Sequence, residues 1–258
     1  MPTDNKGIKI SMKNIFLAAL LALISVSTAV ATPVLDAETV NDAINDANDA
    51  YDDDIDPIES VNRGITHFND AVDTVIYKPV ARSYRYVVPQ WGRNRVSNVL
   101  YNLSEPLTVV NSTLQADPEN SFTSLWRFII NSTVGVLGIF DVAESFGLKP
   151  RQEDFGQTFA SWGWSKSSYL VLPFLGPSTL RDALGLGVEW VADPVNIASS
   201  DEARIARYVA EAIDERTHLL PVTDEVERTS LDKYASYRSI YLQERKTNID
   251  NGKLTPAY

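Results

Sequence analysis

The chain has 258 residues, with 23 Lys and Arg against 34 Asp and Glu, two His and no Cys, which gives a formal net charge of −11. The lack of cysteine excludes disulfides, thiolate nucleophiles, cysteine-ligated metal sites and a lipid-modified cysteine within this sequence. The acidic balance argues against a nucleic-acid partner, and 44% hydrophobic residues are enough for a folded core.

The N-terminal residues 1–31 have the pattern of a cleaved secretory signal peptide. Three lysines precede an apolar run over residues 15–26, and a small-residue Ala-Val-Ala exit ends at Ala31. The run is too short to cross about 30 Å of hydrocarbon as a helix, so cleavage is favoured over an uncleaved anchor. Met12 is an alternative start, because a complete signal follows it.

Residues 32–55 form an acidic, low-complexity segment that predicts a disordered tether. A calcium site is the alternative, because Asp52, Asp54 and Asp56 have the spacing of the first three ligands of a calcium loop. Pro57 stands where that loop needs Gly, and its final Glu is also missing. We therefore favour the tether and expect no metal site.

Amphipathic helices are predicted over most of the body, residues 56–246. Asp56 and Pro57 are typical of an N-cap and a first helical residue, and apolar side chains then recur at helical spacing until Pro79. Prolines are expected to bound the later helices as well. The further helical stretches are expected over residues 80–88, 93–102, 106–114, from the start signal at Asp117 onward, and over 201–217 and 224–245, which Pro221 separates.

The run over residues 122–140 is apolar on more than one helical face, although Arg127 and Asn131 interrupt it. A helix of this kind is either deeply buried or in contact with lipid. The run contains too many polar residues to predict a membrane-spanning segment.

The middle of the chain, residues 147–200, is rich in Gly, Pro and aromatic residues. Short extended pieces are expected over 155–164 and 168–172, a turn at 176–178, and a helix over 179–190. The segment therefore predicts a short hairpin within a mainly α-helical protein.

No catalytic set is visible in the sequence. His67 and His218 are isolated, so surface or helix-face histidines are favoured over a general base. The adjacent carboxylates Glu153 and Asp154 follow Arg151, which favours a structural ion pair over acid–base chemistry. Neither a phosphate loop nor a dinucleotide-binding glycine pattern occurs, so we expect no cofactor and no enzymatic activity.

Many short motifs, in order over about residues 56–246, resemble the VacJ/MlaA-type phospholipid-transport proteins. Any one motif is weak, but the ordered set is specific. The motifs are DPIESVNR (56–63), FN (68–69), YKPVA (77–81), VP (88–89), Arg93, SN (97–98), NLSEP (102–106), NSTLQ (111–115), RFIINSTVG (127–135), EDFGQT (153–158), WG (162–163), YLVLPFLGPS (169–178), RD (181–182), YLQ (241–243) and Arg245.

The resemblance implies a mainly α-helical ring of amphipathic helices that encloses an amphipathic channel, on the periplasmic side of the Gram-negative outer membrane. Such proteins remove misplaced phospholipids from the outer leaflet and pass them to a soluble periplasmic carrier, usually while bound to trimeric porins. No bond is broken in this process. The alternative is an outer-membrane structural or surface-interaction protein that does not transfer lipid.

The candidate site residues follow from the resemblance and from side-chain chemistry. The expected channel residues are Phe68, Asn69, Arg127, Asn131, Gly135 and Gly138. The expected membrane-interface residues are Trp126, Trp162, Trp164 and Trp190, for which core packing is an equal alternative. For Arg127, a lipid phosphate and an ion-paired or snorkelling position are equally weighted.

One departure from the family pattern concerns attachment. Many members are lipoproteins with a cysteine directly after the signal, and this chain has none. Attachment is therefore expected to rest on the amphipathic helices and a porin partner. Residues 247–258 are expected to form a flexible tail.

Overall fold

The computed structural model describes residues 55–250. The predicted signal peptide and the predicted tether up to residue 54 lie outside these residues, as do residues 251–258. The first two aspartates of the calcium alternative lie outside them as well. Within the described residues, no cluster of three or more His, Cys, Asp or Glu side chains could hold a metal ion.

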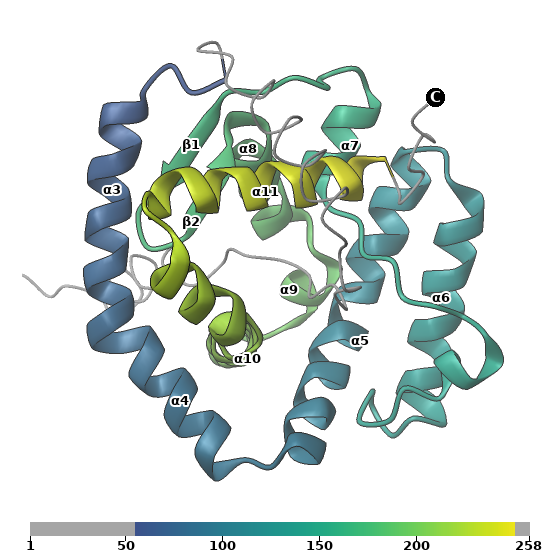
Figure 1. Ribbon diagram of the computed structural model, residues 1–258. Coiled ribbons are helices and arrows are strands. Elements are labelled where there is room, and N and C mark those ends of the chain that lie inside the picture. The colour runs from purple at the N-terminus through teal and green to yellow at the C-terminus, as the bar shows by residue number, and fades with distance from the viewer. Residues whose placement is uncertain (1–54, 251–258) are drawn as a thin grey trace, which may run out of the picture.

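The described part of the chain is mainly α-helical and contains one two-stranded antiparallel sheet, as predicted (Figure 1). The elements in order are α3 (Glu59–Val72), the π-helical turn η1 (Asp73–Tyr77), α4 (Lys78–Val87), α5 (Gln90–Leu114), α6 (Pro118–Thr133), the 3-10 turn η2 (Ala143–Phe146), α7 (Phe155–Ser161), β1 (Tyr169–Leu172), β2 (Gly176–Thr179), α8 (Leu180–Ala192), α9 (Pro194–Ala198), α10 (Asp201–Thr229) and α11 (Lys233–Ile249).

The elements follow one another around a ring (Figure 1). α3 and α4 form one side, α5 forms the other with α6 outside it, and the β1–β2 hairpin, α8 and α7 lie at the end opposite the α4–α5 corner. In this view α10 lies within the frame, and α11 crosses in front of the hairpin and α8. α10 packs against α4 and α5, whereas α11 contacts α7 and β2.

The first helical arm differs from the prediction at both ends. Asp56 is not an N-cap: α3 begins without a side-chain cap at Ile58, and the buried Asp56 carboxylate accepts hydrogen bonds from Asn62 and Arg238, each at 2.7 Å. Pro79 does not end the helix. The Lys78 N–H bonds the carbonyl of the fifth residue before it, and this wider turn accommodates a proline that has no N–H to contribute.

Two other prolines expected at helix boundaries, Pro106 and Pro221, lie inside α5 and α10. These helices pack against each other and against other elements of the ring, and tertiary packing offsets the loss of one backbone hydrogen bond. The break predicted at Pro221 instead falls between Thr229 and Lys233. α11 continues to Ile249, past the predicted end of the folded body.

α6 begins as predicted, because the Asp117 side chain accepts a hydrogen bond from the Asn120 N–H at 3.0 Å. It ends at Thr133, although the apolar run continues to Phe140. The backbone turns left-handed at residues 136, 137 and 138, with φ values of 54°, 56° and 87°. A right-handed helix cannot continue through that conformation.

The Gly/Pro/aromatic-rich middle contains the predicted hairpin, with two local corrections. Residues 155–161, expected to be extended, form helix α7, capped by the Asp154 side chain on the Gln157 N–H at 2.8 Å. Residues 176–178, expected to be a turn, belong to β2, which pairs Gly176 with Leu172. The turn lies just before, and Gly176 takes φ 86°.

The interior of the described residues is unusually polar. A small apolar cluster joins β1 to α11 through Tyr169, Val171 and Tyr234. Among all described residues, buried polar and charged residues outnumber buried apolar ones, 22 to 11, so apolar burial is not the main organising feature of this interior. Within the described residues, no helix combines the length and apolar character needed to cross a bilayer.

Candidate functional site

Helix α6 carries its polar side chains inward and its apolar side chains outward. The buried residues of α6 are Asn120, Ser124, Arg127 and Asn131. The exposed large apolar residues of α6 are Phe122, Leu125, Trp126 and Ile129. Both sets recur at helical spacing, so the helix has two distinct faces with the reverse of the polarity usual for a water-soluble protein.

Helix α5 shares this inverted pattern, and the two helices pack through polar contacts. Every fully buried residue of α5 is polar: Ser97, Asn102, Glu105, Thr108, Asn111 and Ser112. Asn102 donates to the Ser132 hydroxyl at 2.9 Å, and Asn120 donates to the Ser112 hydroxyl at 2.8 Å. Hydrogen bonds between buried polar side chains therefore help to join these helices.

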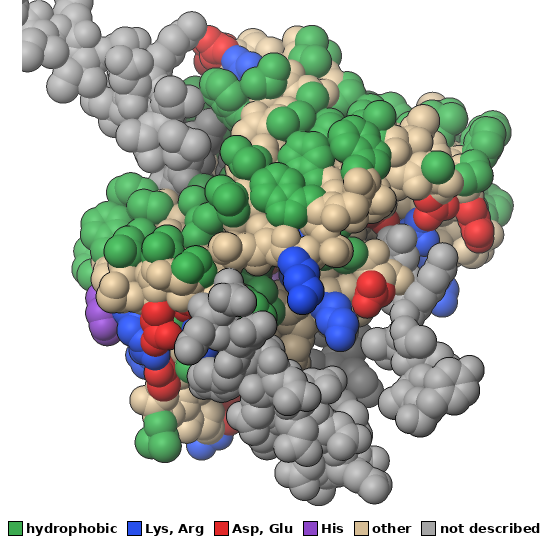
Figure 2. All heavy atoms as spheres, turned by 90° about the horizontal axis from the view of Figure 1, so that it is seen from above, with side chains coloured by type: hydrophobic (Ala, Val, Ile, Leu, Met, Phe, Trp, Pro, Cys, Tyr) green, Lys and Arg blue, Asp and Glu red, His purple; other side chains and the backbone are tan. Residues whose placement is uncertain are grey.

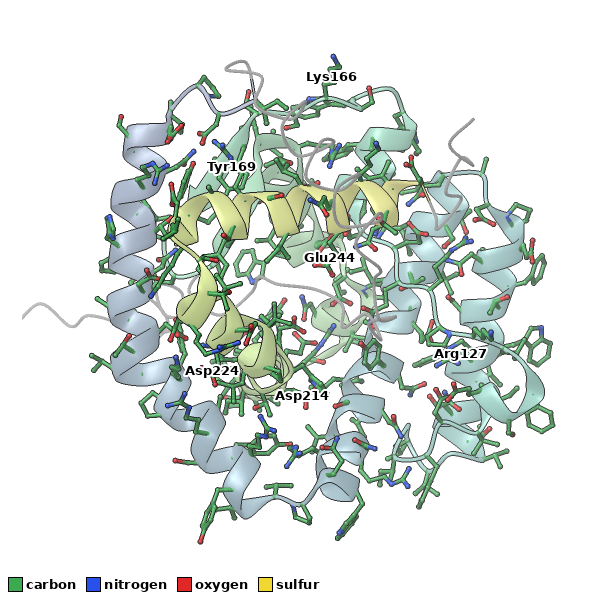
Figure 3. The ribbon with its side chains drawn as sticks, viewed as in Figure 1. Arg127, Lys166, Tyr169, Asp214, Asp224 and Glu244 are labelled. Atoms are coloured by element: carbon green, nitrogen blue, oxygen red, sulfur yellow. The ribbon has the colours of Figure 1, made fainter. Side chains whose placement is uncertain are left out.

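Arg127 lies between α5 and α6 (Figure 3) and is 2% exposed. Its guanidinium contacts Glu105 at 2.6 Å and Asp141 at 2.9 Å, and also donates to the Leu148 carbonyl. Burial raises the pKa of Glu105 despite the opposing Arg127 charge. For Asp141, burial is outweighed by the hydrogen bonds from Arg127 and Asn131, and the pKa is lowered. Of the two uses open for Arg127, the structure therefore shows the ion pair.

Asn131, Gly135 and Gly138 shape the turn that follows α6. The Asn131 side chain donates to Asp141 at 3.0 Å and accepts from the Ala143 N–H at 2.9 Å. A Cβ added at Gly135 would lie 2.2 Å from the Phe140 carbonyl oxygen, and one at Gly138 would lie 2.6 Å from Cβ of Asn102. Both glycines thus permit close backbone approach.

Phe68 and Asn69 join α3 to the tip of the hairpin. Asn69 donates to the Leu172 carbonyl at 2.9 Å and accepts from the Phe174 N–H at 2.6 Å. The Phe68 and Phe174 rings meet edge to face, with centroids 4.9 Å apart. These two candidates therefore lie on the opposite side of the ring from the Arg127 group (Figure 1).

The four tryptophans expected at a membrane interface are all exposed, with fractions from 37% for Trp164 to 59% for Trp162. The Trp162 indole N–H donates to the Leu114 carbonyl at 3.0 Å. Exposure disfavours core packing, and contact with a membrane interface stays a prediction. Sequence reasoning missed Trp91, which is 70% exposed beside the α4–α5 corner.

Exposed apolar side chains gather on the face seen in Figure 2. They form a broad band across the upper half of that view, whereas most charged side chains lie below it. Helix α8 contributes to the exposed apolar surface at helical spacing, through Leu180, Leu184, Val188 and Val191. A surface with this much contiguous apolar area marks a site of contact with lipid or protein.

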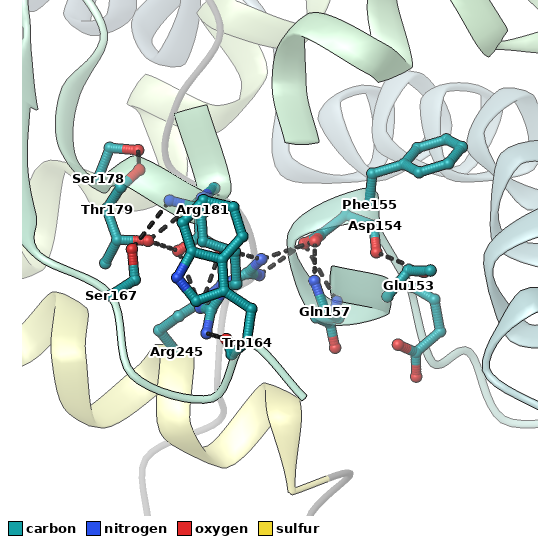
Figure 4. Close-up of polar contacts among 12 residues, drawn as sticks. Glu153, Asp154, Phe155, Gln157, Trp164, Ser167, Ser178, Thr179, Arg181 and Arg245 are labelled. Atoms are coloured by element: carbon teal, nitrogen blue, oxygen red, sulfur yellow. Dashed lines mark hydrogen bonds and ion pairs between the residues drawn. The ribbon is translucent and has the colours of Figure 1, made fainter. Parts of the chain in front are cut away.

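Partly buried charges also join α7, α8 and α11 (Figure 4). Arg245 of α11 contacts Asp154 at 2.5 Å and Asp182 at 2.8 Å, and Arg181 contacts Asp182 at 2.9 Å. Burial alone would raise the pKa of Asp182, but the two arginines outweigh it and lower the pKa to about 2. Sequence analysis named Arg181, Asp182 and Arg245 only as parts of family motifs and did not predict their contacts, because Arg245 is remote in sequence from the other two.

The other polar groups singled out in the sequence also have structural contacts. Arg151 contacts Glu153 at 3.3 Å, which confirms the predicted ion pair. Burial raises the pKa of Glu153 to about 7. His218 lies 2.9 Å from the carbonyl oxygen of Asp214, one turn earlier in α10. These contacts are local ones, within the segment before α7 and within α10, and they do not pair a nucleophile with a base.

Comparisons with known proteins agree on one family. A family model described as "MlaA lipoprotein" matches residues 54–248. The "Intermembrane phospholipid transport system lipoprotein MlaA" of Shigella flexneri is 34% identical over 212 residues, which cover 78% of this chain and 81% of that protein. The protein of the same name from Escherichia coli K12 has the same identity and coverage.

Two further matches extend this agreement. An uncharacterized protein of Rickettsia bellii is 33% identical over 211 residues, 81% of each chain. A solved structure described as "Structural basis for maintenance of bacterial outer membrane lipid asymmetry" has a TM-score of 0.67 and 32% identity, and the match covers 75% of this chain and 98% of that one.

Proposed function

Because the chain belongs to the MlaA family, we propose that it removes misplaced phospholipids from the outer leaflet of the Gram-negative outer membrane and passes them to a soluble periplasmic carrier. The named relatives are components of an intermembrane phospholipid transport system. The proposed process moves lipid without breaking a bond, so it needs no catalytic set.

The observation that carries this proposal is the inverted polarity of α5 and α6. Their buried residues are polar, whereas the outward face of α6 presents Phe122, Leu125, Trp126 and Ile129. Lipid solvates an apolar exterior, and hydrogen bonds among the buried polar side chains hold such a wall together within an apolar layer. We propose that the ring encloses such an amphipathic channel.

Attachment to the membrane is proposed to rest on exposed apolar side chains and a trimeric porin. The Shigella and Escherichia relatives are named lipoproteins, but this sequence contains no cysteine that could carry the lipid. Exposed apolar residues on amphipathic helices bind membranes in proportion to the apolar area that they bury, so they can provide attachment in its place. We place the protein on the periplasmic side of the outer membrane, exported by its N-terminal signal.

The six candidate channel residues are proposed to act by holding the channel wall in place. Arg127 and Asn131 join α6 to the segment around Asp141, and Asn69 holds the hairpin tip. Their polar groups already have protein partners, so positioning is better supported than direct contact with lipid.

The test follows lipid from the membrane to the carrier. Outer membranes carrying radiolabelled phospholipid would be isolated from cells with and without the gene and incubated with the purified periplasmic lipid carrier. We expect labelled lipid on the carrier only when the protein is present. If the protein reaches the outer membrane but the carrier stays empty, the alternative holds: an outer-membrane interaction protein that does not transfer lipid.

A further inference from the structure

The turn after α6, residues 134–140, is apolar and exposed. Val134, Val136 and Leu137 have exposed fractions of 66%, 54% and 74%. No charged or polar side chain occurs from residue 134 to residue 140. A water-exposed turn is usually built from Gly, Asn, Asp, Ser and Pro, so this composition is unusual for a loop in contact with water.

The turn is also held in an unfavourable backbone conformation. Val136, Leu137 and Gly138 take φ values of 54°, 56° and 87°. Consecutive left-handed residues are rare for L-amino acids, and a β-branched valine disfavours this region strongly. Such strain persists only where surrounding contacts enforce it, and it points to a functional constraint.

The contacts that enforce the turn also pair most of its N–H groups. N–H groups of Leu137, Gly138 and Phe140 donate to carbonyls within residues 131–135, at distances from 2.8 to 3.1 Å. The N–H groups of Val134, Gly135 and Ile139 likewise have backbone partners. Within the turn, residues 134–140, Val136 is the one residue whose N–H has no backbone partner among the described residues. From α5, Asn98 donates to the Ile139 carbonyl at 3.1 Å.

A segment in hydrocarbon has no water to receive its backbone N–H groups, so the pairing of these donors within the protein favours such a position. Water would otherwise complete these hydrogen bonds, and a typical protein interface also contains polar groups that pair across it. The turn presents aliphatic side chains and only one unpaired backbone N–H group, that of Val136. Such a surface suits contact with acyl chains better than contact with water or with a protein partner. It also continues the outward apolar face of α6, whose last exposed member is Ile129.

We propose that residues 134–140 form a wedge that inserts Val134, Val136 and Leu137 among the acyl chains of the bilayer. The proposal rests on the membrane association proposed above and identifies the segment that enters deepest beside α6. Arg95 marks the edge of the wedge, since its guanidinium lies 4.6 Å from the centroid of the Phe140 ring and can remain near the headgroups.

The lack of native cysteine makes a single-site label straightforward. Leu137→Cys would be labelled with an environment-sensitive fluorophore and mixed with vesicles of phosphatidylethanolamine and phosphatidylglycerol, some carrying a nitroxide on the acyl chain. Leu231→Cys is the matched control, because Leu231 is a fully exposed leucine between α10 and α11, beside charged residues. Co-flotation with the vesicles reports binding independently of the label.

A blue-shifted emission that the nitroxide quenches at residue 137 but not at residue 231 would support the wedge. If the protein floats with the vesicles while the label at 137 stays in water, the wedge is overturned and membrane association stands. Equal shifts at the two sites also overturn it, because they indicate non-specific adsorption. Failure to float contradicts the wedge together with the proposed membrane attachment.

A second pair of variants needs no label. Leu137→Asp should weaken co-flotation about tenfold to a hundredfold, the range expected for losing one buried leucine from hydrocarbon. Leu231→Asp should leave it unchanged. Both positions are exposed, so neither change is expected to unfold the chain, and circular dichroism checks this. Equal binding by the two variants would overturn the proposal.

Discussion

The Nε atom of Arg127 lies 2.6 Å from Oε1 of Glu105, and both side chains are almost completely buried. Glu105 belongs to α5 and Arg127 to α6, so this pair joins the two helices whose polarity is inverted. Asp141, 2.9 Å from the same guanidinium, extends the group to the segment after the apolar turn. The pair therefore holds together the wall on which the proposed function depends.

Removing one charged side chain from the group formed by Arg127, Glu105 and Asp141 should lower the free energy of unfolding. Arg127→Met leaves the buried Glu105 without its cation, and we expect a loss of about 3–5 kcal/mol in the free energy of unfolding. The double variant Arg127→Met/Glu105→Leu removes both charges and should lose less. Urea unfolding in detergent compares them. A double variant as unstable as the single one would show that the uncompensated charge is not the cause.

Acid should weaken the contacts of α11 with α7 and α8. The folded-state pKa of Asp182, about 2, is below its ordinary value of 3.8, so its contribution to stability is present above pH 4 and is lost as pH falls toward 2. Asp182→Asn should cost about 2 kcal/mol at pH 7 and much less at pH 2. Unfolding measured across this range tests the claim, and a cost that does not change with pH would contradict it.

Glu215 of α10 should affect the pH dependence of stability in the opposite direction to Asp182. Burial is the main cause, and repulsion from Glu244 and Asp214 adds to it; together they raise the pKa of Glu215 from 4.5 to about 8. Figure 3 shows Glu244 on α11 and Asp214 on α10. A raised carboxylate pKa contributes stability below pH 4.5 that is lost as pH rises to 8. Glu215→Gln should therefore be more stable than the natural chain at pH 8, by about 4 kcal/mol, and equal to it at pH 4.

The hairpin tip should loosen when Asn69 is truncated. Asn69→Ala removes both hydrogen bonds to the tip, which holds Phe174 at φ 66°, and should cost about 1–2 kcal/mol. We expect faster amide hydrogen exchange at residues 172–176 with little change in α5 and α6. Faster exchange throughout the ring would instead show that Asn69 supports the whole fold.

Local sequence signals predicted most elements of this fold. The cap at Asp117, the hairpin in the aromatic-rich middle and the helix after residue 179 all follow from neighbouring residues. Prolines misled the prediction at Pro106 and Pro221, because packing by distant elements sustains those helices. The left-handed turn at residues 136–138 ended α6 against its apolar pattern, since the contacts that enforce it come partly from α5.

The contacts of the candidate site were harder to predict from the sequence, because they too join residues that are far apart in the chain. Arg245 meets Asp154 from 91 positions away, and Arg238 meets Asp56 from 182 positions away. No local pattern encodes such pairs. The sequence could show that Arg127 interrupts an apolar run, but not that two carboxylates from other segments occupy its guanidinium.

The central claim is that the protein removes phospholipid from the outer leaflet. The most direct test measures phospholipid exposed on the cell surface, in otherwise identical cells with and without the gene. We predict that exposure rises on deletion and returns to normal when the natural chain is restored. Unchanged exposure, in cells where the protein is shown to reach the outer membrane, would contradict the account.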